Sequence, residues 1–178
     1  GAFSIYANKG VYNAPMMVTK IEDKYGNVLA NFYPESREVI TENTAFLMAN
    51  LLQGVVDEGT GRRLRFRYGF KNQIGGKTGT TQNHSDGWFI GITPDLAGGV
   101  WVGAEDRSIH FQNLANGQGA SMALPIWALF MQKVYADKSL AVPQSDFQKP
   151  NGVNHVLDCG DADREGMTDY DSSDEIFD

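Results

Sequence analysis

The chain has 178 residues, of which 42% are hydrophobic, enough for one core of ordinary size. Its net charge of −7 is concentrated at one end: residues 158–178 hold nine acidic side chains and one Arg, which leaves 14 basic and 13 acidic groups elsewhere. That nearly neutral body gives no reason to expect nucleic acid or an anionic membrane as a partner, and the single cysteine, Cys159, excludes an intrachain disulfide.

The first third of the chain predicts a helix end, a hairpin and a second helix. The opening GAFSIYANKG contains the asparagine and glycine that typically end a helix. Alternating apolar residues on both sides of the turn KYGN predict a hairpin over residues 16–33. Thr41 is placed to cap a helix over residues 42–58, because apolar residues follow it at helical spacing and Gly59 follows the last turn.

The middle of the chain predicts a small antiparallel sheet. Residues 62–70, RRLRFRYGF, alternate basic with apolar side chains, which fits a cationic strand over an anionic ligand but favours an edge strand or ordered loop. Strands are predicted over residues 73–81, 87–93 and 98–105. Because the turn TPDLAGG joins the last two strands tightly, they should be antiparallel neighbours.

The C-terminal part divides into a helix and an acidic extension. Ser121 is placed to cap a helix over residues 122–136, with Pro125 in its tolerant first turn. An antiparallel sheet flanked by helices makes the predicted fold class α+β. Residues 137–178 have a composition typical of disordered segments, so we expect everything after Ala141 to be dispensable for folding.

The segment IGGKTGTTQNH contains a motif that suggests chemistry. Gly76-Lys77-Thr78 matches the end of a phosphate-binding Walker A loop, but that loop needs a glycine at position 71, which is Lys71. It also needs a helix that begins at the lysine, whereas Gly79 and the threonines favour an extended strand. These two mismatches exclude a phosphate loop.

A lysine on a strand beside a glycine suits a different chemistry. Since Gly79 has no side chain, a ligand backbone can lie flat against the strand. Lys77 supplies a positive charge, and Thr78 and Thr80 supply hydroxyls beside the strand amides. Such groups can hold a carboxylate and stabilise a developing oxyanion. The alternative is an ordinary exposed lysine, because a Lys-Thr-Gly triplet arises by chance in on the order of a few per cent of chains this long.

The flanking sequence favours the first interpretation. GGKTGTT is followed by DGWFIGITPD, GGVWVGAED and ASMALPIWALFM, and it is preceded by AFSIYANKGVY and VTKIEDKYGNVL. In this order the segments resemble the penicillin-binding transpeptidase family, most of all its bifunctional class A, which also carries a glycosyltransferase. The resemblance covers residues 1–136 and implies the C-terminal portion of a β-lactamase/transpeptidase-like domain; the extension over residues 137–178 lies outside it.

The resemblance implies serine acyl transfer without a cofactor. In the family, a serine attacks the D-alanyl-D-alanine end of a peptidoglycan stem peptide, D-alanine leaves, and an amine from a second strand resolves the acyl-enzyme. β-Lactams imitate the donor and trap the serine. By resemblance, Lys77 belongs to the proton-transfer network, the hydroxyls of Thr78 and Thr80 meet the donor carboxylate, and Gly79 lies against the substrate. The Thr80 amide would form half of the oxyanion hole.

The family's other two motifs are missing. No serine in the chain has lysine three positions later or asparagine two positions later. The Ser-x-x-Lys nucleophile and the Ser-x-Asn motif are therefore expected upstream of Gly1, in a protein anchored at the extracytoplasmic face of the bacterial inner membrane. The Tyr-x-Asn tripeptides at residues 6–8 and 25–27 copy a variant of the second motif, but a helix end and a hairpin turn favour structural roles.

Alone, the chain is expected to be inactive, and the surfaces meant for the upstream half of its domain are expected to cause self-association. Two alternatives stay open. One is a noncatalytic peptide- or wall-binding module whose site was never complete. The other is a D,D-carboxypeptidase or β-lactamase relative, which would pass the acyl group to water.

Five further residues invite functional interpretations. His84 and Asp86 form a His-x-Asp pattern, but the other histidines are scattered, so no metal site is expected. We expect His84 to be solvated at the rim of the cleft and Asp86 to hold the turn. Trp88, Phe89 and Trp101 are expected to pack within the sheet.

Overall fold

The computed structural model describes residues 1–153, so the extension predicted to be disordered over residues 137–178 lies outside the described residues from position 154 onward. Helices and strands mix along the chain and the strands pair antiparallel, so the predicted α+β class is confirmed. The elements are α1 (Ser4–Ala7), β1 (Val11–Asn13), β2 (Lys20–Glu22), β3 (Val28–Asn31), β4 (Ser36–Glu38), α2 (Glu42–Asp57), α3 (Arg63–Phe66), β5 (Gly75–Thr80), η1 (Gln82–His84), β6 (Asp86–Ile92), β7 (Ala97–Gly103), α4 (Leu114–Gly117), α5 (Gly119–Ala136) and η2 (Lys138–Leu140).

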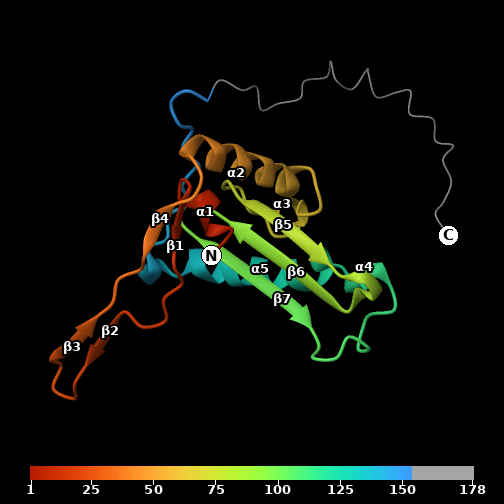
Figure 1. The fold of residues 1–178 in the computed structure, drawn as a ribbon. Coiled ribbons are helices and arrows are strands. Elements are labelled where there is room, and N and C mark those ends of the chain that lie inside the picture. The colour runs from red at the N-terminus through yellow and green to blue at the C-terminus, as the bar shows by residue number, and fades with distance from the viewer. Residues whose placement is uncertain (154–178) are drawn as a thin grey trace.

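The body is built around the three-stranded sheet β5-β6-β7, with β5 at one edge (Figure 1). Both strand pairs are antiparallel, as predicted, and the three predicted strands are each confirmed with slightly different bounds. Helix α5 covers one face of the sheet, where Phe89 of β6 and Trp127 of α5 meet with ring centroids 5.4 Å apart. Helix α2 packs on the other face at the start of β5, against Gly75.

Helix α2 forms where the spacing predicts it. The Thr41 side chain accepts a hydrogen bond from the Thr44 amide (3.2 Å) and so satisfies one of the free donors of the first turn. Ala45, Ala49 and Leu52 lie on the buried stripe of the helix. Because two of the four buried residues of α2 are alanines, the helix can approach the sheet closely.

Helix α5 begins earlier than predicted, at Gly119, and Ser121 does not cap it. The Gly119 amide donates instead to Thr80 Oγ1 of β5 (3.0 Å), so a neighbouring strand supplies the acceptor that a capping side chain would provide. A Cβ at Gly119 would lie 2.4 Å from the carbonyl oxygens of Gly79 and Trp88, so the close contact requires glycine. As a result, Pro125 lies inside the helix rather than in its first turn.

The strand considered for residues 62–70 is wrong, and the ordered loop is interrupted by the single-turn helix α3, which was not predicted. Leu64 is fully buried in the core, and the flanking arginines bond to neighbouring helices and loops. Arg63 donates to the Ala120 carbonyl oxygen (2.9 Å), and Arg65 pairs with Asp57 (2.7 Å). These two cations therefore hold the body together instead of facing an anionic ligand.

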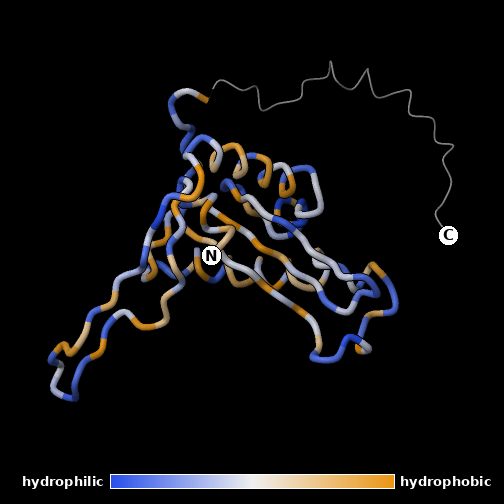
Figure 2. Tube along the Cα trace, in the orientation of Figure 1, coloured by the Kyte–Doolittle hydropathy of each residue, from blue (hydrophilic) through white to orange (hydrophobic). Residues whose placement is uncertain are grey.

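A two-stranded arm extends from the body and confirms the predicted hairpin, with strands β2 and β3 shorter than the range 16–33. Its turn is held by Asp23, and the side-chain and main-chain hydrogen bonds from Asn27 keep the pKa of that carboxyl below its ordinary value. Hydrophobic residues recur along the arm (Figure 2), and the side chains of Ile21 and Leu29 are exposed there. The pairing of β1 with β4 at the base of the arm was not predicted.

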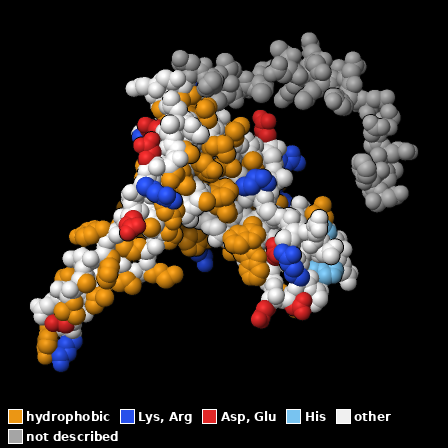
Figure 3. All heavy atoms as spheres, in the orientation of Figure 1, with side chains coloured by type: hydrophobic (Ala, Val, Ile, Leu, Met, Phe, Trp, Pro, Cys, Tyr) orange, Lys and Arg blue, Asp and Glu red, His pale blue; other side chains and the backbone are white. Residues whose placement is uncertain are grey.

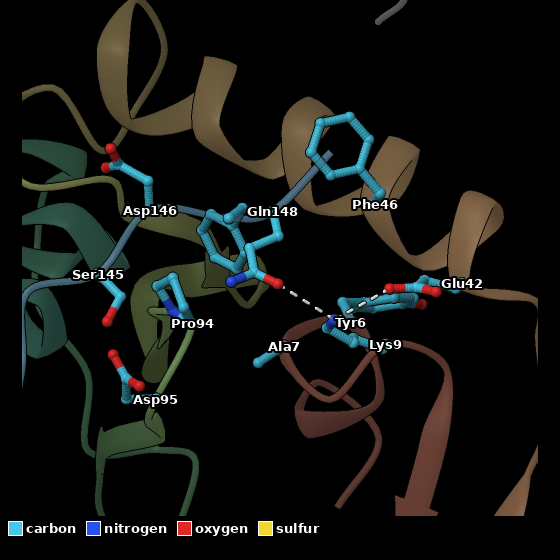
Figure 4. A pocket seen from close by; sticks show the side chains of 11 residues that line it. Tyr6, Ala7, Lys9, Glu42, Phe46, Pro94, Asp95, Ser145, Asp146 and Gln148 are labelled. Carbon is cyan, nitrogen blue, oxygen red and sulfur yellow. Dashed lines mark hydrogen bonds and ion pairs between the residues drawn. The ribbon is translucent and has the colours of Figure 1, made fainter. Parts of the chain in front are cut away.

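The segment after α5 contacts the body, which counts against the expectation that everything beyond Ala141 is dispensable for folding. Phe147 packs against the buried cluster of Ala49, Leu52 and Ile92, and its amide donates to Gln73 Oε1 (2.8 Å). Figure 4 shows the segment that carries Ser145, Asp146 and Gln148 passing between α2 and the loop of Pro94 and Asp95. Acidic composition pointed to disorder for the whole extension, but one aromatic side chain is enough to anchor its first part.

We expect Phe147→Ala to lower the free energy of unfolding by about 1–2 kcal/mol, since a half-buried aromatic ring loses its contacts. Urea unfolding followed by circular dichroism would measure the change. Lys149→Ala, which removes an exposed side chain two positions away, is the matched control and should leave stability unchanged. Equal stabilities of the Phe147 variant and the unmutated chain would show that this segment is dispensable after all.

Candidate active site

The Lys-Thr-Gly motif lies on β5, whose outer edge is unpaired in the sheet of the described residues. Thr81 donates its amide to the Asp86 carbonyl oxygen (3.1 Å), which fixes the alternation of hydrogen bonds along the hairpin. By this alternation Gly79 and Lys77 exchange main-chain bonds with β6, opposite Trp88 and Ile90. The amides and carbonyls of Thr78 and Thr80 therefore point outward, toward the free edge.

The side chains of the motif divide between the two faces of the sheet. Thr78 and Thr80 stand opposite Phe89 and Gly87, so they lie on the face covered by α5. Lys77 lies on the opposite face, and its side chain is exposed. Its ammonium group bends to the outer edge and donates to the Thr78 carbonyl oxygen (2.8 Å). The positive charge and two outward amides therefore lie along one edge of β5, with the two hydroxyls next to them on the face covered by α5.

Both hydroxyls of the motif have partners inside the protein. Thr80 Oγ1 accepts from the Gly119 amide, which leaves its own proton available to donate. Thr78 Oγ1 lies 2.8 Å from Thr60 Oγ1, in the turn between α2 and α3, and either atom can be the donor. Neither Thr60 nor Gly119 was found from the sequence; the only signal was the pair of glycines that flank Thr60.

Glycines next to the lysine control how closely other groups approach. A Cβ at Gly76 would lie 2.8 Å from the Phe89 ring, and one at Gly75 would lie 3.0 Å from Leu52 of α2. Gly79 differs, because the nearest atom to its Cβ would be Trp88 Cβ at 3.3 Å, with no other element close by. The first two glycines serve core packing, and Gly79 leaves the strand surface open.

The turn after β5 is tighter than expected. Asn83 and His84 both adopt left-handed φ values, 61° and 56°, which are unusual for residues other than glycine. His84 was expected to be solvated, but its Nδ1 is buried and makes no hydrogen bond within residues 1–153. Thr81 Oγ1 accepts from the Asp86 amide (3.0 Å), so Asp86 does hold the turn, through its main chain.

Trp88 and Trp101 do not pack as predicted, whereas Phe89 does. Phe89 is fully buried, but Trp88 and Trp101 stand opposite each other on the face away from α5, and each is 46% exposed. The alternation along β6 places neighbours on opposite faces, so only one of two adjacent aromatic residues can enter this core. Figure 3 shows apolar side chains gathered over the middle of the molecule and along the arm.

The pocket in Figure 4 is separate from this edge. It measures about 210 Å³ and is lined by α1, α2 and the segment around Phe147, with none of the motif residues. Lys9 lies at its wall, 3.1 Å from Glu42 and 3.3 Å from Gln148 Oε1. These bonds join three parts of the chain, which gives the pocket wall a structural role.

Residues 1–153 contain neither a metal-binding cluster nor a membrane-spanning helix. No group of three or more His, Cys, Asp or Glu side chains is arranged to hold a metal ion in this part of the chain. Within the same residues, none of the helices combines the length and the apolar character needed to cross a bilayer.

Comparison with known proteins identifies the family of the chain. Residues 1–120 match the family model described as the penicillin binding protein transpeptidase domain. The chain belongs to this family. It is 34% identical to penicillin-binding protein 1A of Aquifex aeolicus over 84% of this chain, and 32% identical to penicillin-binding protein 2D of Bacillus subtilis over 87% of this chain. The predicted resemblance, including its class A character, is confirmed.

Solved structures of penicillin-binding proteins share the fold. Penicillin-binding protein 1A of Haemophilus influenzae matches 77% of this chain and 26% of its own with a TM-score of 0.69 and 24% identity. Penicillin-binding protein A of Mycobacterium tuberculosis, in an imipenem acyl-enzyme complex, matches 72% of this chain and 28% of its own with a TM-score of 0.56 and 20% identity. The chain spans 19% of the A. aeolicus relative and 22% of the B. subtilis relative.

Proposed function

We propose that this chain forms the Lys-Thr-Gly wall of a peptidoglycan D,D-transpeptidase. The observation that carries the proposal is the free edge of β5, where an exposed ammonium, outward amides and two hydroxyls lie together in a penicillin-binding protein. Such an edge can pair with an extended peptide and hold its terminal carboxylate. A stem peptide ending in D-alanyl-D-alanine fits this chemistry, as does a β-lactam that imitates it.

Each motif residue has a separate role in this proposal. The outward Thr80 amide donates to the oxyanion that forms when the donor carbonyl is attacked. Lys77 provides positive charge beside the reacting groups and takes part in proton transfer. Thr78 and Thr80 donate their hydroxyl protons to the carboxylate of the donor, and Gly79 lets the donor backbone lie against the strand. An amine from a second peptidoglycan strand then accepts the acyl group.

The nucleophile in this proposal belongs to a segment upstream of Gly1. Relatives several times longer than this chain support it, because they leave room for the remaining motifs and a glycosyltransferase. The exposed face around Trp88 and Trp101 would be covered by the upstream half of the domain, and without that half it would favour self-association. We place the site outside the cytoplasmic membrane, where peptidoglycan is assembled.

We expect this chain alone to gain no covalent label from a fluorescent penicillin, because it has no Ser-x-x-Lys motif. The full-length protein, in which the upstream segment precedes Gly1, should be labelled stoichiometrically. Denaturing gel electrophoresis with fluorescence detection distinguishes the two results. A label on this chain would place the nucleophile within it, and an unlabelled full-length protein would favour the noncatalytic binding module.

A further inference from the structure

Thr60 lies at the free edge of β5, although it is 18 positions away from Thr78 in the chain. It follows α2, which packs on one face of the sheet, and precedes α3, whose Leu64 enters the core on the other. The chain therefore wraps around the outer edge of β5 at this turn. Thr60 is the residue of the turn whose side chain bonds to the Lys-Thr-Gly strand.

The turn is held rigidly enough to fix the Thr60 hydroxyl. Gly61 donates its amide to the Val55 carbonyl oxygen (2.8 Å), and Gly59 donates to the Gly54 carbonyl oxygen (3.1 Å). A Cβ on Gly59 or Gly61 would lie 3.0 Å from the Val55 backbone, so both positions pack tightly against the end of α2. Because α2 itself packs on β5, the position of Thr60 is tied to that of the strand.

Three groups meet at Thr78. The Lys77 ammonium donates to its carbonyl oxygen, the Thr60 hydroxyl lies 2.8 Å from its hydroxyl, and its amide points to the free edge. Thr60 is exposed and Thr78 half-buried, so a hydrogen bond between them adds little to folding stability. The hydrogen bond between Thr60 and Thr78 matters instead because it influences where the Thr78 hydroxyl proton points.

We propose that Thr60 is a positioning residue that makes Thr78 a donor to the carboxylate of the acyl donor. A carboxylate only accepts hydrogen bonds, so it selects the arrangement in which Thr60 donates to Thr78 and Thr78 donates to the ligand. Consecutive hydrogen bonds of this kind polarise and strengthen one another. The inference rests on the proposed function, since it assigns the recognition of the donor carboxylate to the Thr60–Thr78 pair.

The test compares Thr60→Val and Thr60→Ser with the unmutated full-length protein, using benzylpenicillin and its methyl ester. Thr60→Val keeps the shape of the side chain but removes the hydroxyl. We expect it to raise the benzylpenicillin concentration for half-maximal acylation about 3- to 10-fold, with little change in the limiting rate. Thr60→Ser should retain the unmutated values. The methyl ester has no carboxylate, so its acylation rate should be the same in all three proteins.

The controls separate the possible failures. Thr19→Val removes an exposed hydroxyl on the arm and should change neither reaction. Unchanged kinetics in Thr60→Val, equal losses with both ligands, or a Thr60→Ser variant that fails like Thr60→Val would each overturn the positioning role. If the unmutated protein is not acylated at all, the proposed function fails, and this inference fails with it.

Discussion

Lys77→Ala in the full-length protein is expected to slow acylation by benzylpenicillin at least about 100-fold, the usual scale for loss of one electrostatic or proton-transfer partner. The lysine is exposed on the edge strand, and its ammonium group already lies at the edge where the donor would bind. Its charge would therefore act on the transition state. Stopped-flow measurement of acylation gives the rate directly.

Folding should survive this substitution, because Lys77 makes no core contact. A melting curve beside the kinetics tests that expectation. Lys71→Ala is the matched control: it removes another exposed lysine shortly before the same strand and should leave acylation unchanged. Thr80→Val should also slow acylation, but less, because its outward amide remains. Acylation of the Lys77 variant at the unmutated rate would favour a noncatalytic binding module.

The sheet and its motif could be predicted because local pattern and tertiary structure agree there. Alternation and a Pro-Asp turn define β6 and β7, and the Lys-Thr-Gly strand carries residues that a helix would not favour. Thr41 capped α2 as predicted because its bond is made within the first helical turn. Features of this kind depend on neighbours in the sequence, so the sequence is sufficient to find them.

The errors occurred where distant contacts decide the structure. Residues 62–70 alternate like a strand, but Leu64 enters the core and Arg63 reaches the start of α5, which together favour a helical turn. The start of α5 was misplaced because its acceptor, Thr80, comes from another element. Trp88 was assigned to the core because it is apolar and adjacent to Phe89, but the alternation along β6 places it on the face away from α5, where it is 46% exposed.

Only part of the candidate site could be predicted, because some of its groups lie on one strand and another comes from a turn distant in the sequence. Lys77 and its threonines share one short strand and are recognisable as a motif. Thr60 contributes through a contact that joins residues 18 positions apart. The glycines that flank it do not indicate which residue its side chain contacts. A residue that acts through another is therefore harder to find from sequence than one that touches the substrate.

Trp127 of α5 is the largest fully buried side chain of the described residues. It is 2% exposed and packs edge-on against Phe89, with ring centroids 5.4 Å apart. The strands beneath its indole carry glycines: a Cβ at Gly91 would lie 2.4 Å from the ring, and one at Gly98 would lie 3.2 Å from Nε1. The sheet is thus shaped to receive this one side chain, and no neighbour can move in to fill its place.

Trp127→Ala should therefore lower the free energy of unfolding by about 3–5 kcal/mol, a large share of the total for a domain of this size. Trp101→Ala is the matched control, since that tryptophan belongs to the same sheet but is 46% exposed, and it should cost less than half as much. Trp127→Phe should fall between them: it loses volume, but it also removes an indole N–H that makes no hydrogen bond within residues 1–153. Urea unfolding of the three variants provides the comparison. Equal losses at Trp127 and Trp101 would mean that the glycine-lined contact does not hold α5 to the sheet.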